Sequence, residues 1–127
     1  MAHGIGSYLG NAWLNALGNN TSFAVAQVYV KLHVGDPGAN GTANPATETT
    51  RKAVSFGVAS AGVLTSDDDV TWTNIAGSQD ANHFTAWDSL TTGNFLFSGT
   101  ITANPYDAGD TYTISSGNLT ATLTLAS

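Results

Sequence analysis

Cysteine is absent from this chain of 127 residues, and charged residues are scarce. The absence of cysteine excludes disulfides, thiolate metal sites and a cysteine nucleophile. Charged residues make up 9% of the chain, against about 25% in an average soluble domain. Threonine, serine, asparagine and glycine supply the polarity instead, which suits strands and close contacts between subunits better than a freely diffusing enzyme.

Positive charge is especially rare, because Lys31, Arg51 and Lys52 stand against nine acidic residues and the net charge is −6. Without a basic stripe to neutralise phosphates, we expect no nucleic-acid partner. No apolar run approaches the roughly 20 residues that span a bilayer, so we expect no membrane partner. The first residues, Met1 to Gly4, lack a positive region followed by an apolar one, so we expect no secretory signal and synthesis in a cytoplasm.

The chain is organised around a strand, a tight turn and a second strand. From Ala24 to Val34 apolar residues alternate with polar ones, which places Lys31 and His33 on the face opposite the apolar set. The turn Asp36-Pro37-Gly38 ends this strand. A polar excursion from Gly35 to Thr50 then precedes the second strand, and it is longer than most connections. We expect this loop to be mobile in an isolated chain and to contact a neighbouring subunit.

The rest of the chain repeats short alternating strands separated by polar turns. About eight such strands, spaced 8–12 residues apart, predict a mostly β fold, an antiparallel β-sandwich with a short N-terminal α-helix. The last strand, Asn118–Leu125, is the most regular, and its inward residues are predicted to be Leu119, Ala121, Leu123 and Leu125. We divide the chain into an N-terminal arm and helix, 1–22, and a β-sandwich, 23–127, within one domain.

The helix is predicted over residues 7–17, where apolar residues recur at helical spacing. Its apolar stripe consists of Ile5, Leu9, Trp13 and Ala16 or Leu17. Ser7 can cap its beginning and Gly18 can close its end. Gly10 weakens the helix by about 1 kcal/mol relative to alanine, so it needs a surface to pack against. That surface is either its own domain or a neighbouring subunit.

Six short motifs carry a resemblance to a known family. They are Leu32–Gly38, Arg51–Phe56, Asp69–Trp72, Gly93–Phe97, Gly109-Asp110 and Gly117–Leu119. They resemble small virion proteins of tailed bacteriophages, which are usually labelled tail-fibre or minor tail proteins and in some cases head decoration proteins. The resemblance implies a non-enzymatic assembly protein of the virion, with no cofactor.

Two groups of residues could suggest chemistry. Asp67-Asp68-Asp69 resembles part of a calcium site but lacks the spaced ligands and the terminal glutamate, so we predict a solvated turn and no metal site. His33 and His83 each have an aspartate nearby, but no nucleophile motif accompanies either pair. The sequence therefore predicts that the protein is not an enzyme and has no catalytic residues.

Aromatic residues could form either a core or a platform that stacks on sugars. Those considered are Trp13, Trp72, Phe84, Trp87, Phe95 and Phe97. Their alternating positions favour a core. Trp87 is the expected exception, because it shares a strand face with His83 and Thr85.

These observations predict a structural virion protein. The favoured role is a capsid decoration or minor capsid protein that binds the major capsid protein. We expect it to be a homo-oligomer, with a trimer favoured. The alternative is a minor tail or tail-fibre protein that binds other tail components, and a third hypothesis is a host-glycan-binding module. The candidate partner-binding residues are Leu9, Trp13, Asp36, Pro37, Gly38, Asn40, Asn44 and Pro45.

Overall fold

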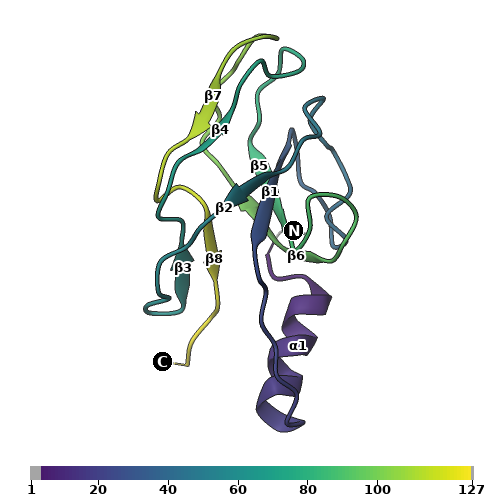
Figure 1. Cartoon of the computed structure of the whole chain (residues 1–127), viewed down its shortest axis with the longest axis vertical. Helices are drawn as coiled ribbons and strands as arrows, with labels where there is room; N and C mark the ends of the chain where they lie inside the picture. The colour runs from purple at the N-terminus through teal and green to yellow at the C-terminus, as the bar shows by residue number, and fades with distance from the viewer. Residues whose placement is uncertain (1–3, 127) are drawn as a thin grey trace.

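A computed structural model describes residues 4–126, which form one helix and eight strands (Figure 1). The helix, α1, spans Ser7–Gly18. The strands are β1 (Val28–His33), β2 (Lys52–Val54), β3 (Val63–Thr65), β4 (Val70–Trp72), β5 (His83–Trp87), β6 (Phe95–Thr100), β7 (Tyr112–Ile114) and β8 (Thr120–Thr122). All the strand pairs are antiparallel. The predicted fold class, mostly β with a short N-terminal helix, is confirmed.

The largest sheet has four strands in the order β2-β1-β5-β6. Strand β1 lies at its centre beside β5, and the register places Leu32 opposite Phe84 and Val30 opposite Ala86. These four side chains are almost completely buried. The pairing of β5 with β6 shifts register between Ala86 and Trp87, as a bulge does, where β5 runs into its connection with β6.

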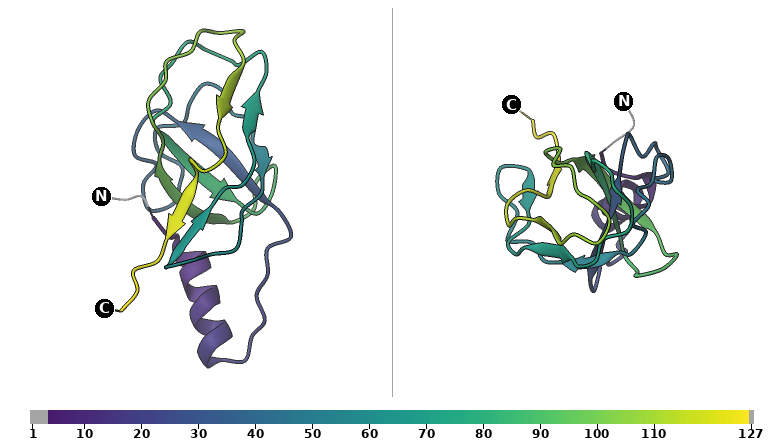
Figure 2. Two further views of the ribbon diagram at one scale, coloured as in Figure 1. Left: turned by 90° about the vertical axis from the view of Figure 1, so that its left-hand side faces the viewer. Right: turned by 90° about the horizontal axis from the view of Figure 1, so that it is seen from above.

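Two two-stranded ribbons, β3–β8 and β4–β7, complete the sandwich. The left view of Figure 2 shows both ribbons in front of the four-stranded sheet. Trp72, which pairs with Tyr112, and Ile114, which pairs with Val70, join Leu32 and Phe84 in one hydrophobic core. Such a core, built from the inward faces of short strands, is what stabilises a domain that has no disulfide.

Strand β1 differs from its predicted pattern. It begins at Val28 rather than near Ala24, and His33, expected on the outer face, is fully buried like Leu32. The reason is that the excursion after β1 folds back over the end of the strand, where the backbone of His33 bridges that of Pro45. This part of β1 is therefore covered on both faces.

The prediction for the last strand was wrong beyond Thr122. Leu119 is 1% exposed, but Leu123 and Leu125 are 47% and 55% exposed. Strand β8 pairs only with the three residues of β3, and the last backbone hydrogen bond of this segment runs from the Leu123 amide to the Gly62 carbonyl, at 2.7 Å. Beyond it the chain has no partner strand to hold alternate side chains against the core.

Residues 4–6 also differ from the N-terminal arm that was expected. Residues 4–6 lie along the edge of β6 rather than forming a free arm, because the Ser98 amide donates to the Gly4 carbonyl and the Gly6 amide donates to the Leu96 carbonyl. Residues 1–3 lie outside the described part. The helix cap is Gly6, without a side-chain hydrogen bond, and not Ser7. A Cβ at Gly6 would come within 2.9 Å of the Phe95 ring, so glycine permits this close approach.

The helix contacts β6 at its beginning and then extends away from the sandwich (Figure 1). Of its apolar stripe, Leu9 is buried, Trp13 is 37% exposed and Leu17 is 85% exposed. The helix continues through Gly18 and its C-cap is Asn19. In the second part of α1, Leu14 and Leu17 are exposed, and no other segment among residues 4–126 covers them.

Candidate functional site

The predicted partner-binding residues of the excursion form a structured turn. The Gly38 amide donates to Oδ1 of Asp36 at 2.9 Å, and Gly38 has a φ of +78°. The Asn44 amide group donates to the Asp36 carbonyl at 2.8 Å. Pro37 is buried, whereas Asn40, Asn44 and Pro45 are exposed. Asp36, Pro37 and Gly38 thus shape the loop, and the exposed surface available to a partner belongs to the other three.

The rest of the excursion is tied back to the strands of its own chain. The Val34 amide donates to the Asn44 carbonyl at 2.9 Å, and the Ala46 amide donates to the Leu32 carbonyl at 3.1 Å. This pairing extends the edge of β1. The length of the loop is used to fold back along β1. Its mobility in an isolated chain and its contact with a neighbouring subunit stay predictions.

A packing contact fixes the tip of this loop. Gly41 has a φ of +73°, and a Cβ there would lie 2.5 Å from the Phe95 ring. Gly41→Ala should lower the free energy of unfolding by about 2–3 kcal/mol, because it combines overpacking with an unfavourable backbone conformation. Gly109→Ala is the control, since Gly109 has a φ of +91° but its nearest contact is 3.8 Å away. Chemical denaturation should show a smaller loss for Gly109→Ala; equal losses would mean that the contact with Phe95 is unimportant.

A buried hydrogen-bond chain joins the loop to two strands. Trp87 Nε1 donates to Thr85 Oγ1 at 2.7 Å, and Thr85 Oγ1 lies 2.9 Å from His33 Nε2. His33 Nδ1 lies 2.8 Å from the Ala43 carbonyl oxygen. Since the Thr85 hydroxyl accepts from Trp87, its proton is available to His33 Nε2, and Nδ1–H then donates to Ala43. With a neutral imidazole, every group in this series of hydrogen bonds has a partner.

Burial lowers the pKa of His33 below its ordinary value of 6.5, with Lys31 adding to the effect and the hydrogen bond to Ala43 opposing it. The unfolded chain therefore takes up a proton near pH 6.5 that the folded chain does not. This histidine stabilises the fold above pH 6.5, and its contribution is lost as the pH falls below that value.

His33→Gln tests this assignment. The variant should lose about 1–2 kcal/mol at pH 7, because glutamine does not reproduce both hydrogen bonds. It should also show a smaller decline in the free energy of unfolding between pH 7 and pH 5 than the natural chain, as measured by denaturant titration at each pH. An unchanged decline would show that another group causes it.

Glu48 anchors the end of the loop. Its carboxylate accepts from the Ala76 amide at 3.0 Å and from the Thr50 amide at 3.1 Å. Burial acts to raise the pKa of Glu48, but these hydrogen bonds together hold it below its ordinary value. The Thr50 carbonyl in turn accepts from Nε1 of the buried Trp72, at 2.8 Å. The loop is thus connected to the centre of the core.

The three consecutive aspartates serve as hydrogen-bond acceptors within turns. Asp67 accepts from the Ser55 hydroxyl, and Asp69 accepts from the Ser116 amide at 2.8 Å. Asp68 is exposed. Within residues 4–126, no group of three or more histidine and acidic side chains is placed to hold a metal ion.

Trp87 is not the exposed aromatic that the sequence predicted. It is 8% exposed, and the Arg51 guanidinium lies over its ring at 4.2 Å from the centroid. Arg51 Nη1 also donates to the carbonyls of Ser89 and Thr92, each at 2.7 Å. The face of the indole on which a sugar would stack is thus occupied by an arginine that holds the β5–β6 connection.

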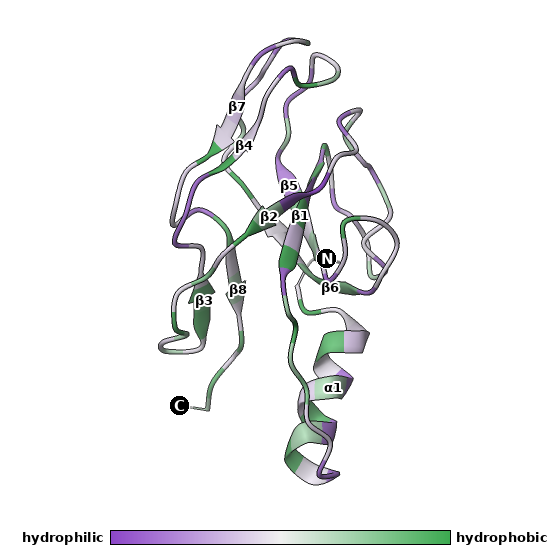
Figure 3. Ribbon diagram, in the orientation of Figure 1, coloured by the Kyte–Doolittle hydropathy of each residue, from purple (hydrophilic) through white to green (hydrophobic). Residues whose placement is uncertain are grey.

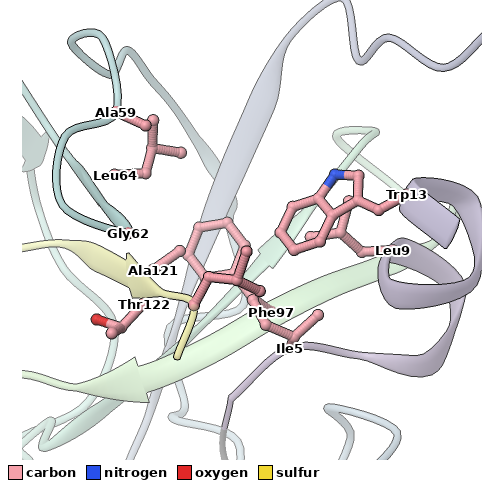
Figure 4. Close-up of a pocket in the computed structure, with 10 residues that line it drawn as sticks. Ile5, Leu9, Trp13, Ala59, Gly62, Leu64, Phe97, Ala121 and Thr122 are labelled. Atoms are coloured by element: carbon pink, nitrogen blue, oxygen red, sulfur yellow. The ribbon is translucent and has the colours of Figure 1, made fainter. Parts of the chain in front are cut away.

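The other two predicted partner-binding residues, Leu9 and Trp13, line an apolar groove between α1 and the β3–β8 ribbon (Figure 4). The groove has a volume of about 250 Å³. Its lining consists of Ile5, Leu9, Trp13, Ala59, Gly62, Leu64, Phe97, Ala121, Thr122 and Leu123. The structure therefore brings Leu9 and Trp13 together with the C-terminal ribbon, separate from the excursion loop. Sequence periodicity identified the helix side of this groove, but not the ribbon side.

The fold is a small β-sandwich with an apolar groove between its helix and one of its ribbons. The chain matches the family model described as "Podophage GP4 fiber I protein gp80" over residues 4–122. It therefore belongs to this family, a family of tail-fibre-like structural proteins of tailed-phage virions, as the resemblance predicted. No curated protein matches the chain. In the described part, no helix is long and apolar enough to cross a membrane.

Proposed function

We propose that the protein is a non-enzymatic subunit of a phage tail fibre, or of the tail structure that carries one. The match to the fibre family carries this proposal, because it extends from the first described residue through β8 and so includes the helix, both ribbons and every lining residue of the groove except Leu123. Backbone groups of the loop form hydrogen bonds within their own chain, as expected of a structural protein. The exposed residues of the loop, Asn40, Asn44 and Pro45, offer a second contact area.

A capsid decoration or minor capsid protein, which the sequence favoured, is the second candidate. Its support is the low fraction of charged residues and the absence of an internal repeat of the kind that builds a fibre shaft. The partners would then be the major capsid protein and neighbouring copies of this chain. The family description names a fibre, so we place the tail first.

The number of copies per particle separates the two candidates. In purified virions, quantitative mass spectrometry should find on the order of tens of copies, as a symmetric tail assembly requires, and tail-less heads should lack the protein. Hundreds of copies retained on tail-less heads would support the decoration role instead. Absence of the protein from purified virions would contradict both.

A further inference from the structure

A second cleft, the polar cleft, lies between β7 and the segment that follows β6. It has a volume of about 330 Å³ and shares no lining residue with the apolar groove. Strand β7, which lines it, and α1 lie at opposite ends of the molecule in Figure 1. Its lining consists of Ile101, Thr102, Ala103, Asn104, Tyr112, Thr113, Ile114, Ser115 and Asn118. The polar cleft is therefore separate from the surfaces described above.

The rim of the polar cleft carries many hydrogen-bonding groups and no charge. Six of the nine lining residues have a hydroxyl or a carboxamide group, and none is acidic or basic. Figure 3 shows β7 mostly in pale colours of intermediate hydropathy, in contrast to the green of β3. Four exposed side chains of the rim form no hydrogen bond with any residue of 4–126, and these are Thr102, Asn104, Ser115 and Asn118. Their donors and acceptors are available to a ligand.

The floor of the polar cleft is apolar and held by packing. Ile101, Tyr112 and Ile114 are only 9%, 5% and 5% exposed. The Tyr112 ring packs on Tyr106 at a centroid distance of 5.0 Å and on Trp72 at 6.1 Å. A hexopyranose ring presents C–H groups on its faces and hydroxyl groups around its edge. An apolar floor inside a polar rim offers a matching surface for such a ring.

One side of the rim is a turn that is fixed before any ligand arrives. The Asn118 amide donates to the Ser115 carbonyl at 3.2 Å, and the Ser116 amide donates to Oδ1 of Asp69 at 2.8 Å. Gly117 supplies the φ of +93° that this turn requires. Because the turn is already ordered, a ligand would not bear the entropic cost of ordering it.

From these features we propose that the polar cleft binds a neutral hexopyranose unit of a glycan. An acidic sugar fits less well, because the Asp69 carboxylate holds the rim turn, no basic residue lines the cleft, and the net charge is −6. This site differs from the platform predicted at Trp87, where Arg51 covers the indole. The inference depends on the cleft alone, so it applies to a tail subunit and to a head subunit equally.

NMR titration of the full chain tests the inference, with methyl glycosides of glucose, galactose and N-acetylglucosamine as probes. At least one probe should shift the backbone amides of residues 101–104 and 112–118, with a dissociation constant of about 1–10 mM for a single ring. Glucuronate should bind at least about threefold more weakly than that probe. Equal affinity for glucuronate, shifts confined to other residues, or no shift with any probe would overturn the inference.

A short peptide is the competing occupant, because β7 pairs only with β4 and its other edge could accept an added strand. Tetraalanine serves as the probe for this alternative. Shifts of the cleft amides with tetraalanine and with none of the sugars would assign the cleft to strand addition and overturn the inference.

Two asparagine variants test the rim directly. Asn104→Ala and Asn118→Ala should each raise the dissociation constant of the sugar about three- to tenfold, because each removes one hydrogen-bonding group. Asn11→Ala is the matched control, since Asn11 is an exposed asparagine of α1 outside the cleft. Circular dichroism checks that the variants fold. Equal affinities for the three variants would overturn the inference and would leave the copy-number test of the proposed function unaffected.

Discussion

Replacing Trp72 by alanine should lower the free energy of unfolding by about 3–5 kcal/mol, the largest effect expected for any single substitution discussed. Trp72 is 1% exposed and packs on the Tyr112 ring at a centroid distance of 6.1 Å. Its Nε1 also donates to the Thr50 carbonyl, which fixes the end of the excursion loop. The substitution therefore creates a cavity and removes a buried hydrogen bond together.

Trp72→Phe separates the two contributions. Phenylalanine keeps most of the packing but cannot donate to Thr50. The loss should fall to about 1–3 kcal/mol, since an unpaired buried carbonyl remains and some volume is lost. Hydrogen exchange of the amides near Thr50 should accelerate in this variant. If the two substitutions cost the same in denaturant titrations, the hydrogen bond rather than the ring volume would control this site.

Leu119→Ala should cost about 2–5 kcal/mol, whereas Leu123→Ala should cost less than about 1 kcal/mol in a monomer. The two leucines lie four residues apart on the same predicted face, but only Leu119 is buried. The Leu119 carbonyl also accepts from the Ser66 amide at 2.9 Å, which secures this segment to the opposite ribbon strand. Denaturation should be measured at a concentration where the chain is monomeric, because Leu123 lines the groove.

Equal costs for the two leucines would show that the C-terminal segment packs as an extended strand beyond Thr122. Leu90→Ala provides a reference for an exposed leucine that is outside both the core and the groove. Its cost should match that of Leu123→Ala in the monomer, and both should be within the range typical of surface substitutions.

Alternation and turn residues were sufficient to predict the fold class, because both depend on local backbone geometry. Strand β4 shows this, because Thr71 is exposed between the buried Val70 and Trp72, and so does the turn at Asp36-Pro37-Gly38. Alternation failed where burial depends on distant segments. His33 is buried because a loop covers β1, and Leu123 is exposed because β3 begins only at Val63, which is opposite Thr122. A single sequence contains no direct signal for either event.

The candidate site could be predicted only in part, because one wall of the groove comes from distant segments of the chain. Helical periodicity identified Leu9 and Trp13, but the ribbon wall of the groove comes from residues more than 45 positions away. The residues of the excursion were predicted to bind a partner because their types favour turns. In the structure, Asp36 accepts hydrogen bonds from Gly38 and Asn44 and Pro37 is buried, so both shape the loop itself. The division of the chain at residue 22 stays a prediction, as does binding by the exposed Asn40, Asn44 and Pro45.

A cryo-EM reconstruction of the phage particle that carries this protein tests the central claim most directly. The sandwich should fit density in a tail appendage. Density for the sandwich on the surface of the head would contradict the tail assignment.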